Sequence, residues 1–322
     1  VCVCVLCVCV FCSLDLYGSD GLVGLTRALN NTKLLLYHTY WGKDTQLAYH
    51  HASPQNNFTF TPSYNFVFSG YARAIYQIQP SQAAEFYKHI FAEYVKQDVV
   101  MGFEVDFLNW HQLTIPALFS VLDGGHELLW GLAEAARVNN MSHQICMSLP
   151  SQVMDTLLLP AITNARASPD NVPTDNSRWR IGYTSLFMWP LDIQPFADNL
   201  WTEAVEPAEP YGRGVVTSNV MLQLMLTVLT AGPLGIGDEI GKTNATHVLQ
   251  SCSQNGTLLH PDKPATPIDA MFAQGPPLKP SGDIWQTHTI LGGGGDSVVV
   301  RDGDGDGGGG VFMWRYVVAI DV

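Results

Sequence analysis

Two acidic side chains lie at the end of the most strand-like stretch of the chain, VVMGFEVDFLNWH. Residues 99–105 are mostly apolar, as expected of a strand that is buried on both faces. Glu104 lies inside this run and Asp106 directly follows it. A carboxylate without a compensating charge is costly in such a position, so it is more often functional than structural. We therefore predict that Asp106 is a catalytic nucleophile and that Glu104 contacts the substrate.

A second carboxyl group is needed for the chemistry that these residues favour. Cleavage of a glycosidic bond uses one carboxyl group as nucleophile or base and another to protonate the leaving oxygen. Asp170, in the segment ARASPDNVP, is our candidate for that acid/base. Arg166 lies four residues earlier and could bind a carboxylate or a sugar hydroxyl. Pro-Asp-Asn is also ordinary turn chemistry, so a structural role for Asp170 stays open.

Other polar and aromatic residues follow predicted strands and are candidates for substrate binding. Asp238 lies between glycines in GIGDEIG, where the backbone can approach a ligand closely. Trp41 and Asp44 would suit a stacking platform and a hydroxyl acceptor, although a tryptophan there can equally belong to the core. Cys146, in QICMSLP, is interpreted as a small buried residue near the floor of the site. A plain turn role for Asp238 stays open.

Helices and strands alternate along the chain, and they must position these residues. Short apolar runs predict strands at residues 34–40, 99–106, 144–149, 161–167, 183–187 and 233–236. Apolar spacing of three and four predicts helices at residues 21–30, 81–97, 127–139 and 219–230. This alternation is typical of a parallel α/β architecture.

We predict a single (β/α)8 TIM-type barrel. Polar residues follow nearly every predicted strand, whereas a doubly wound sheet would concentrate them at one switch point. The chain contains no G-x-G-x-x-G or Walker pattern that would favour a nucleotide-binding fold. Only six strands are predicted, so the barrel is expected to lack its first two.

The predicted domains follow from changes in composition. Residues 1–19 form a low-complexity Cys/Val leader, which could be a signal-peptide core or a buried strand, although we favour the product of a faulty gene model. Residues 20–277 form the catalytic barrel. Residues 278–322 form a partial antiparallel β-domain that contains a Gly/Asp-rich insert.

Charge and composition limit the partners that we expect. The formal net charge is −13, and no basic cluster is present, which disfavours nucleic acid and anionic membrane as partners. The histidines and cysteines show no recurring metal spacing, and we expect no metal and no cofactor. Five N-x-S/T sequons favour a secretory or vacuolar compartment slightly, while cytoplasm and plastid stay open, as does the oligomeric state.

An ordered set of segments carries a specific resemblance across residues 20–290. These segments are EVDFLN, CMSLP, TNARASPDNVP, SRWRIGYTSLFMW, AGPLGIGDEIGKTN and LLHPDKPATPIDAMF. In this order they resemble the family 36 glycoside hydrolases, which include α-galactosidases and raffinose-synthase-type enzymes. The resemblance implies a barrel, a retaining mechanism and α-galactosyl oligosaccharide substrates. It also implies that Asp106 is the nucleophile.

The acid/base motif departs from the pattern of that family. R-A-S-P-D stands here in place of R-x-S-D-D, so Pro169 occupies the position of the first aspartate and Asp170 alone remains. If Asp170 serves as the acid, the chain is a retaining glycosidase or transglycosylase. If the first aspartate is required, the chain is a sugar-binding relic of the same fold without catalysis.

Overall fold

The computed structural model describes residues 4–6, 20–41, 58–63, 67–68, 71–72, 75–169, 181–203, 205–206, 215–216, 219–239, 241–273, 281–291 and 312–321. The chain divides into two compact units. The N-terminal unit comprises Val3–Arg166 with Leu191–Ile193, and the C-terminal unit comprises Val1–Cys2, Ala167–Pro190 and Gln194–Val322. The predicted domain division at residues 19 and 277 stays a prediction.

The N-terminal unit contains most of the regular structure. Its elements are β1 (Cys4–Leu6), α2 (Gly21–Ala28), β2 (Leu34–His38), β3 (Phe60–Pro62), β4 (Val67–Phe68), β5 (Tyr71–Ala72), β6 (Tyr76–Ile78), η2 (Pro80–Gln82), α4 (Ala83–Gln97), β7 (Val100–Val105), α5 (Leu108–Thr114), α6 (Pro116–Phe119), α7 (Gly124–Val138), β8 (Ser142–Ile145), α8 (Pro150–Asp155), η3 (Thr156–Leu158) and β9 (Ile162–Arg166).

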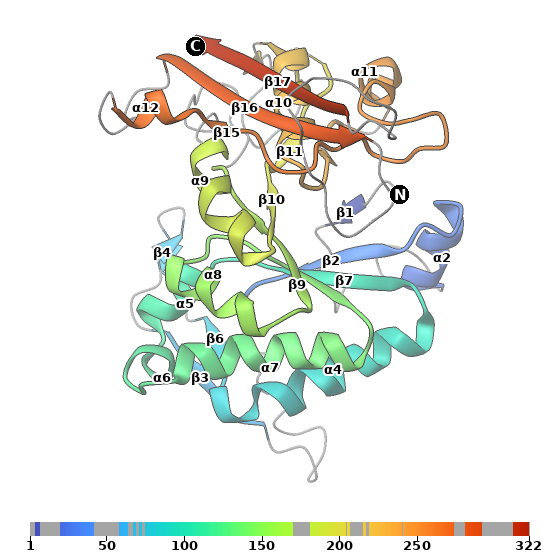
Figure 1. The fold of residues 1–322 in the computed structure, drawn as a ribbon. Coiled ribbons are helices and arrows are strands. Elements are labelled where there is room, and N and C mark those ends of the chain that lie inside the picture. Colours follow the sequence, from blue (N-terminus) through green and yellow to red (C-terminus); the bar gives the residue numbers. More distant parts are fainter. Residues whose placement is uncertain are drawn as a thin grey trace, which may run out of the picture. The chain divides into compact units, whose positions relative to one another are not determined.

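Five strands of this unit form a parallel sheet in the order β1-β2-β7-β8-β9 (Figure 1). The predicted strands at 34–40, 99–106 and 161–167 are confirmed as β2, β7 and β9. β8 ends at Ile145, before the predicted end at residue 149, because the backbone turns into the left-handed region at Met147. Cys4–Leu6 of the leader pair with β2, which favours the strand interpretation for that part of the leader.

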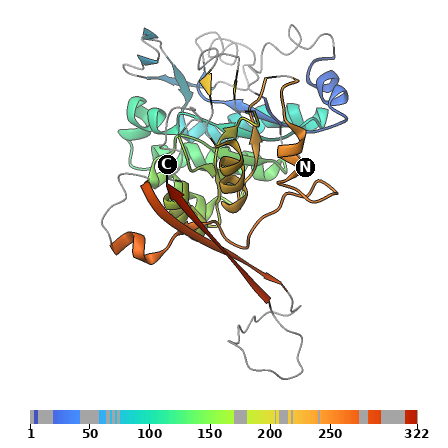
Figure 2. The same cartoon turned by 90° about the horizontal axis from the view of Figure 1, so that it is seen from above.

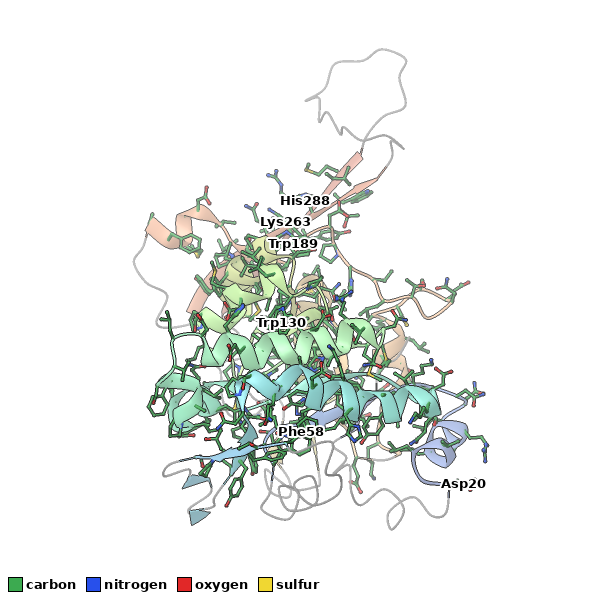
Figure 3. The ribbon with its side chains drawn as sticks, turned by 90° about the horizontal axis from the view of Figure 1, so that it is seen from below. Asp20, Phe58, Trp130, Trp189, Lys263 and His288 are labelled. Atoms are coloured by element: carbon green, nitrogen blue, oxygen red, sulfur yellow. The ribbon has the colours of Figure 1, made fainter. Side chains whose placement is uncertain are left out.

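Helices α4 and α7 lie side by side against one face of this sheet (Figure 1). Gly131 of α7 allows this approach, since a Cβ there would lie 2.6 Å from the Cβ of Ala83. Aromatic rings fill the space between helices and sheet: Phe91 stacks on Phe103 with centroids 4.4 Å apart. Phe58, labelled in Figure 3, packs edge-to-face on Phe86 with ring centroids 5.2 Å apart.

The C-terminal unit is a mixture of helices and short strands. Its elements are α9 (Ile181–Met188), β10 (Gln194–Phe196), β11 (Asn199–Leu200), β12 (Val205–Glu206), β13 (Val215–Val216), α10 (Val220–Leu229), β14 (Gly235–Ile236), α11 (Ala245–Leu249), β15 (Thr266–Pro267), α12 (Asp269–Ala273), β16 (Ser281–Leu291) and β17 (Phe312–Asp321). The predicted antiparallel strands near the C-terminus are confirmed: β16 and β17 form a long ribbon (Figure 2). β15 pairs with β16 in the antiparallel direction.

The predicted strand at residues 183–187 is wrong, because this segment is part of helix α9. A short apolar run does not distinguish a buried strand from a buried helix. The hydroxyl of Ser185 donates to the carbonyl oxygen of Ile181, which closes a helical turn. Trp285, fully buried, packs so closely on Gly182 that a Cβ there would lie 2.8 Å from the indole.

The molecule has an α/β fold with a parallel sheet and separate antiparallel strands, but the closed barrel is not confirmed. In the described part of the chain, the strands of the parallel sheet pair in a row rather than in a ring of eight. The last predicted strand, at residues 233–236, is reduced to Gly235–Ile236 and pairs with β11. No helix in the described ranges is long and apolar enough to span a membrane.

The aromatic core of the N-terminal unit yields a stability prediction. Phe103 is 1% exposed and stacked on Phe91. We expect Phe103→Ala to lower the free energy of unfolding by about 3–5 kcal/mol, because a large cavity would remain. Phe119, 51% exposed, is the matched control, and Phe119→Ala should cost about 1 kcal/mol or less. Urea unfolding followed by fluorescence measures both, and equal losses would contradict this account of the core.

Candidate active site

Asp106 lies one residue beyond β7, and its backbone continues the sheet. Its amide donates to the carbonyl oxygen of His38 at 3.1 Å. The hydroxyl of Thr39 donates to the carbonyl oxygen of Asp106, also at 3.1 Å. The main chain of Asp106 is therefore held against β2 at the carboxyl end of the parallel strands, where α/β folds commonly carry their functional side chains.

Each oxygen of the Asp106 carboxylate accepts a hydrogen bond. The phenol of Tyr37, on β2, donates to Oδ2 at 2.9 Å. The amide of Phe107 donates to Oδ1 at 2.7 Å. Phe107 reaches this position by adopting a left-handed conformation with φ 59°, after which α5 begins. Such a conformation costs a bulky residue about 1–3 kcal/mol, and residues of this kind cluster at functional sites.

The neighbouring strand β8 ends in the same way. Cys146 follows β8 and its amide donates to the carbonyl oxygen of Val105 at 2.9 Å. The next residue, Met147, is left-handed with φ 45°. The amide of Asn109 donates to the carbonyl oxygen of Met147 at 2.8 Å, which ties the two strand ends together. Two adjacent strands thus end in strained, bulky residues, directly after Asp106 and Cys146.

The structure brings together four of the predicted site residues: Glu104, Asp106, Cys146 and Arg166. Burial raises the pKa of the Cys146 thiol, and the charges of Asp106 and Glu104 raise it further, whereas Arg166 lowers it. The Cys146 thiol also forms a hydrogen bond with Asp106 that favours the protonated form. Cys146 is therefore a neutral donor beside Asp106, and it does not have the low pKa of a reactive thiol.

Strand register explains why these four side chains meet. Glu104 pairs with Gln144 on β8, which pairs in turn with Asn164 on β9. Side chains alternate between the two faces of a strand, so residues two apart share a face. Asp106, Cys146 and Arg166 each come two residues after a member of this row, and they therefore lie on the same face as the row.

Gln144 and Asn164, which share this row with Glu104, each have a polar atom whose hydrogen bonding is incomplete. Glu104 is 7% exposed and Gln144 is 2% exposed. Nε2 of Gln144 and Oδ1 of Asn164 are buried without a hydrogen-bond partner. Buried polar groups are normally satisfied, so this row is suited to ordered water or to polar groups of a ligand.

Trp41 lies in the aromatic core on the α4 side of the unit. Its amide donates to the carbonyl oxygen of Tyr76 at 2.9 Å, and its ring meets Phe86 edge-to-face at 5.3 Å. It is 8% exposed, which is typical of a core tryptophan. The stacking role of Trp41 stays a prediction.

Asp238 belongs to the C-terminal unit, where it follows β14. The amide and hydroxyl of Thr202 donate to its two carboxylate oxygens at 2.7 and 2.5 Å. The amide of Asn244 donates in turn to the hydroxyl of Thr202 at 2.7 Å. Asp238 therefore connects two loops, and its binding role stays a prediction. Asp44 and Asp170 lie outside the described residues, while Pro169 is exposed.

Tyr37, Phe107 and Met147 were not predicted from the sequence as site residues. Tyr37 is separated from Asp106 by 69 residues, and only the register of β2 with β7 brings them together. The left-handed conformations of Phe107 and Met147 had no sequence signal, because neither residue type favours that conformation. The one available signal was Tyr37 itself, a hydroxyl in an otherwise apolar strand.

The described residues contain no group of three or more His, Cys, Asp or Glu that could hold a metal ion. One cavity of about 480 Å³ lies in the C-terminal unit, lined by apolar side chains of α10 with Gln250 and Ser251. It has no ionisable group in its lining, so it does not supply acid–base chemistry.

Comparison with known proteins gives no family model and no curated protein that matches the chain. Among solved structures, an α-galactosidase from Thermus thermophilus in complex with stachyose matches with a TM-score of 0.45 and 13% identity, over 71% of this chain and 51% of the other. A GH31 family sulfoquinovosidase from E. rectale matches with a TM-score of 0.47 and 11% identity, over 73% and 36%.

An α-galactosidase from Lactobacillus brevis matches with a TM-score of 0.44 and 13% identity, over 94% of this chain and 46% of the other. All three neighbours are glycoside hydrolases, and the chain spans about half of their length or less. Their substrates and activities belong to those proteins.

Three buried histidines lie close to the strand ends. His38, His111 and His143 have no hydrogen-bond partner for their buried ring nitrogens. Burial holds the pKa of His38 well below its usual value, with further lowering by His143 and His111. Burial also lowers the pKa of His111 to about 4 and that of His143 to about 3. All three are therefore neutral at neutral pH.

These histidines predict that the protein loses stability in mild acid. In the unfolded chain these imidazoles bind protons below about pH 6.5. In the folded chain the pKa is lowered to about 4 for His111 and about 3 for His143, so protons bind there only at lower pH. Stability is therefore lost as the pH falls from 6.5. Each imidazole contributes up to about 1.4 kcal/mol per pH unit.

We expect His143→Phe to reduce the loss of unfolding free energy between pH 7.5 and 5 by about 2 kcal/mol. His89, exposed on α4, is the control, and the loss of unfolding free energy for His89→Gln should exceed that for His143→Phe. Urea unfolding at several pH values measures the slope. An equal slope in all three proteins would show that His143 is not kept neutral by the fold.

Proposed function

We propose that this chain is a retaining glycoside hydrolase or transglycosylase that acts on α-galactosyl-type oligosaccharides. The observation that carries the proposal is the Asp106 carboxylate, which is fixed by hydrogen bonds at the end of a buried parallel strand and lies in one electrostatic cluster with Arg166. The ordered motifs that resemble family 36 support the substrate class. A fixed carboxylate is the group that a retaining mechanism requires as nucleophile.

In the first step of the proposed reaction, a carboxylate oxygen of Asp106 attacks the anomeric carbon. The bond between that carbon and the glycosidic oxygen breaks, and Asp170 gives its proton to the departing oxygen. The product is a glycosyl ester on Asp106. Two carboxyl groups with these roles are expected about 5–5.5 Å apart.

In the second step Asp170, now a carboxylate, takes a proton from water or from a hydroxyl group of an acceptor sugar. The oxygen of that molecule attacks the anomeric carbon, and the ester bond to Asp106 breaks. Both side chains return to their starting protonation states. Water as acceptor gives hydrolysis, and a sugar as acceptor gives transfer.

The proposed sugar contacts combine charged and polar groups. Arg166 and Glu104 supply a donor and an acceptor beside Asp106, and Cys146 supplies a neutral thiol. The remaining proposed contacts come from Trp41, Asp44 and Asp238. The proposed domain that carries the reaction is the barrel of residues 20–277, with residues 278–322 as an accessory β-domain.

A second candidate function follows from Pro169. This residue stands where the family motif has its first aspartate, and a proline cannot donate a proton to a leaving group. In this case the chain would be a sugar-binding relic, which keeps the affinity for galactosides and lacks hydrolysis. Calorimetry with galactose, together with an assay of hydrolysis, separates the two functions.

The nucleophile is tested by Asp106→Asn. We expect this change to lower turnover of an aryl α-galactoside by roughly four orders of magnitude or more, because an amide cannot form the glycosyl ester. A fluorinated galactosyl fluoride should label the wild-type protein on Asp106, as seen by mass spectrometry of the digested protein. Asp98→Asn, which changes an exposed partner of Lys33, is the control and should keep full activity. Undiminished turnover by Asp106→Asn would reject the assignment.

The acid/base is tested by Asp170→Asn with two substrates. For a disaccharide, whose leaving group needs a proton, we expect kcat/KM to fall by roughly 10²–10⁴. For an aryl galactoside with an acidic phenol the loss in the first step should be much smaller, because that phenolate leaves without protonation. Equal effects on both substrates would show that Asp170 is not the proton donor.

A further inference from the structure

The side chain of Asp106 has a torsion that needs an external restraint. The χ2 angle of aspartate, about the bond to its carboxylate, has broad and roughly two-fold minima, unlike the sharp staggered wells of aliphatic torsions. A carboxylate held through one oxygen can therefore still rotate about that contact. A nucleophile must instead present one oxygen along a defined line of attack.

Two separate hydrogen bonds remove this freedom at Asp106. The phenol of Tyr37 holds Oδ2 at 2.9 Å, and the amide of Phe107 holds Oδ1 at 2.7 Å. Rotation of the carboxylate plane would stretch both bonds at once. The amide is fixed by the left-handed turn at Phe107, so Tyr37 is the only side chain of this pair that a substitution can remove cleanly.

The third donor is weaker. The thiol of Cys146 forms a hydrogen bond with Asp106 and stays protonated because its pKa is raised by burial and by the neighbouring carboxylates. A thiol is a weak donor. It can add to the restraint on the carboxylate, but it cannot replace the phenol.

We propose that Tyr37 is a positioning residue, whose phenol, together with the amide of Phe107, locks the orientation of the Asp106 carboxylate for nucleophilic attack. This role rests on the proposed function, since it matters only if Asp106 is the nucleophile. Tyr37 belongs to β2 and pairs with Glu104, so its hydroxyl reaches Asp106 from the next strand, two residues beyond that pair. Tyr37 itself takes no part in bond making or proton transfer.

The test compares two tyrosine-to-phenylalanine variants of the full chain. Tyr37→Phe removes the phenol beside Asp106. Tyr87→Phe is the matched control, because Tyr87 is buried and its hydroxyl donates to Gln77 Oε1 at 3.0 Å, with no contact to Asp106. Each variant loses at least one buried or half-buried hydrogen bond, worth about 1 kcal/mol of stability, so thermal unfolding provides a check that both remain folded.

With an aryl α-galactoside we expect Tyr37→Phe to lower kcat by roughly 10- to 100-fold with KM changed less than about twofold, because misorientation affects attack more than binding. Labelling of Asp106 by the fluorinated galactosyl fluoride should slow to the same degree. Tyr87→Phe should keep kcat within about twofold of wild type. An unchanged kcat in Tyr37→Phe, or equal losses in both variants, would overturn the proposal.

A crystal structure of each protein provides a readout that does not depend on turnover. We expect one orientation of the Asp106 carboxylate in the wild type and in Tyr87→Phe, and a rotated or doubled orientation in Tyr37→Phe. If the wild type hydrolyses no galactoside, the proposed function fails. The comparison of carboxylate orientations still tests whether the phenol of Tyr37 restrains Asp106. An identical single orientation in Tyr37→Phe would show that the phenol does not restrain Asp106.

Discussion

The candidate site depends on the parallel ladder that aligns the carboxyl ends of β2, β7, β8 and β9. Backbone hydrogen bonds from Asp106 to His38 and from Cys146 to Val105 extend this ladder one residue beyond β7 and β8. Each extension is followed by a left-handed residue that turns the chain towards a helix. Because the strands are in register, the side chains after their ends lie on one face. The chemistry proposed for Asp106 follows from that alignment and not from any one residue.

The same strands carry a core whose histidines must stay neutral. The carbonyl oxygen of His38 accepts from the amide of Asp106, so the residue that anchors the candidate nucleophile belongs to the acid-sensitive core. His143 lies 6.1 Å from His38 and 5.5 Å from Phe91, ring to ring. Protonation of this group would require water to enter beneath the strand ends. Acid should therefore disturb the alignment of Asp106 before it disturbs the remote helices.

Sequence alone identified the strands that carry the site but not every element around them. The runs at 34–40 and 99–106 are apolar, short and bounded by polar residues, so their strand character is local. The run at 183–187 has the same local character and is helical, in a segment whose Gly182 packs against Trp285, a residue distant in sequence. The barrel was expected from the polar residues after the strands, which describe strand ends and say nothing about ring closure.

Site residues could be predicted from the sequence where their own type and position marked them. Contacts that depend on the alignment of two strands could not be predicted. Asp106 and Glu104 were visible as acids in an apolar run, whereas the contact between Tyr37 and Asp106 requires the register of β2 and β7. The charges within the cluster also set the protonation state of Cys146, which the composition does not reveal. Glu104 and Asp106 place two carboxylates beside one guanidinium, so a thiolate at Cys146 would add a third negative charge. Burial and these carboxylates keep Cys146 protonated, which turns a residue type known for reactivity into a donor that helps to hold a carboxylate in place.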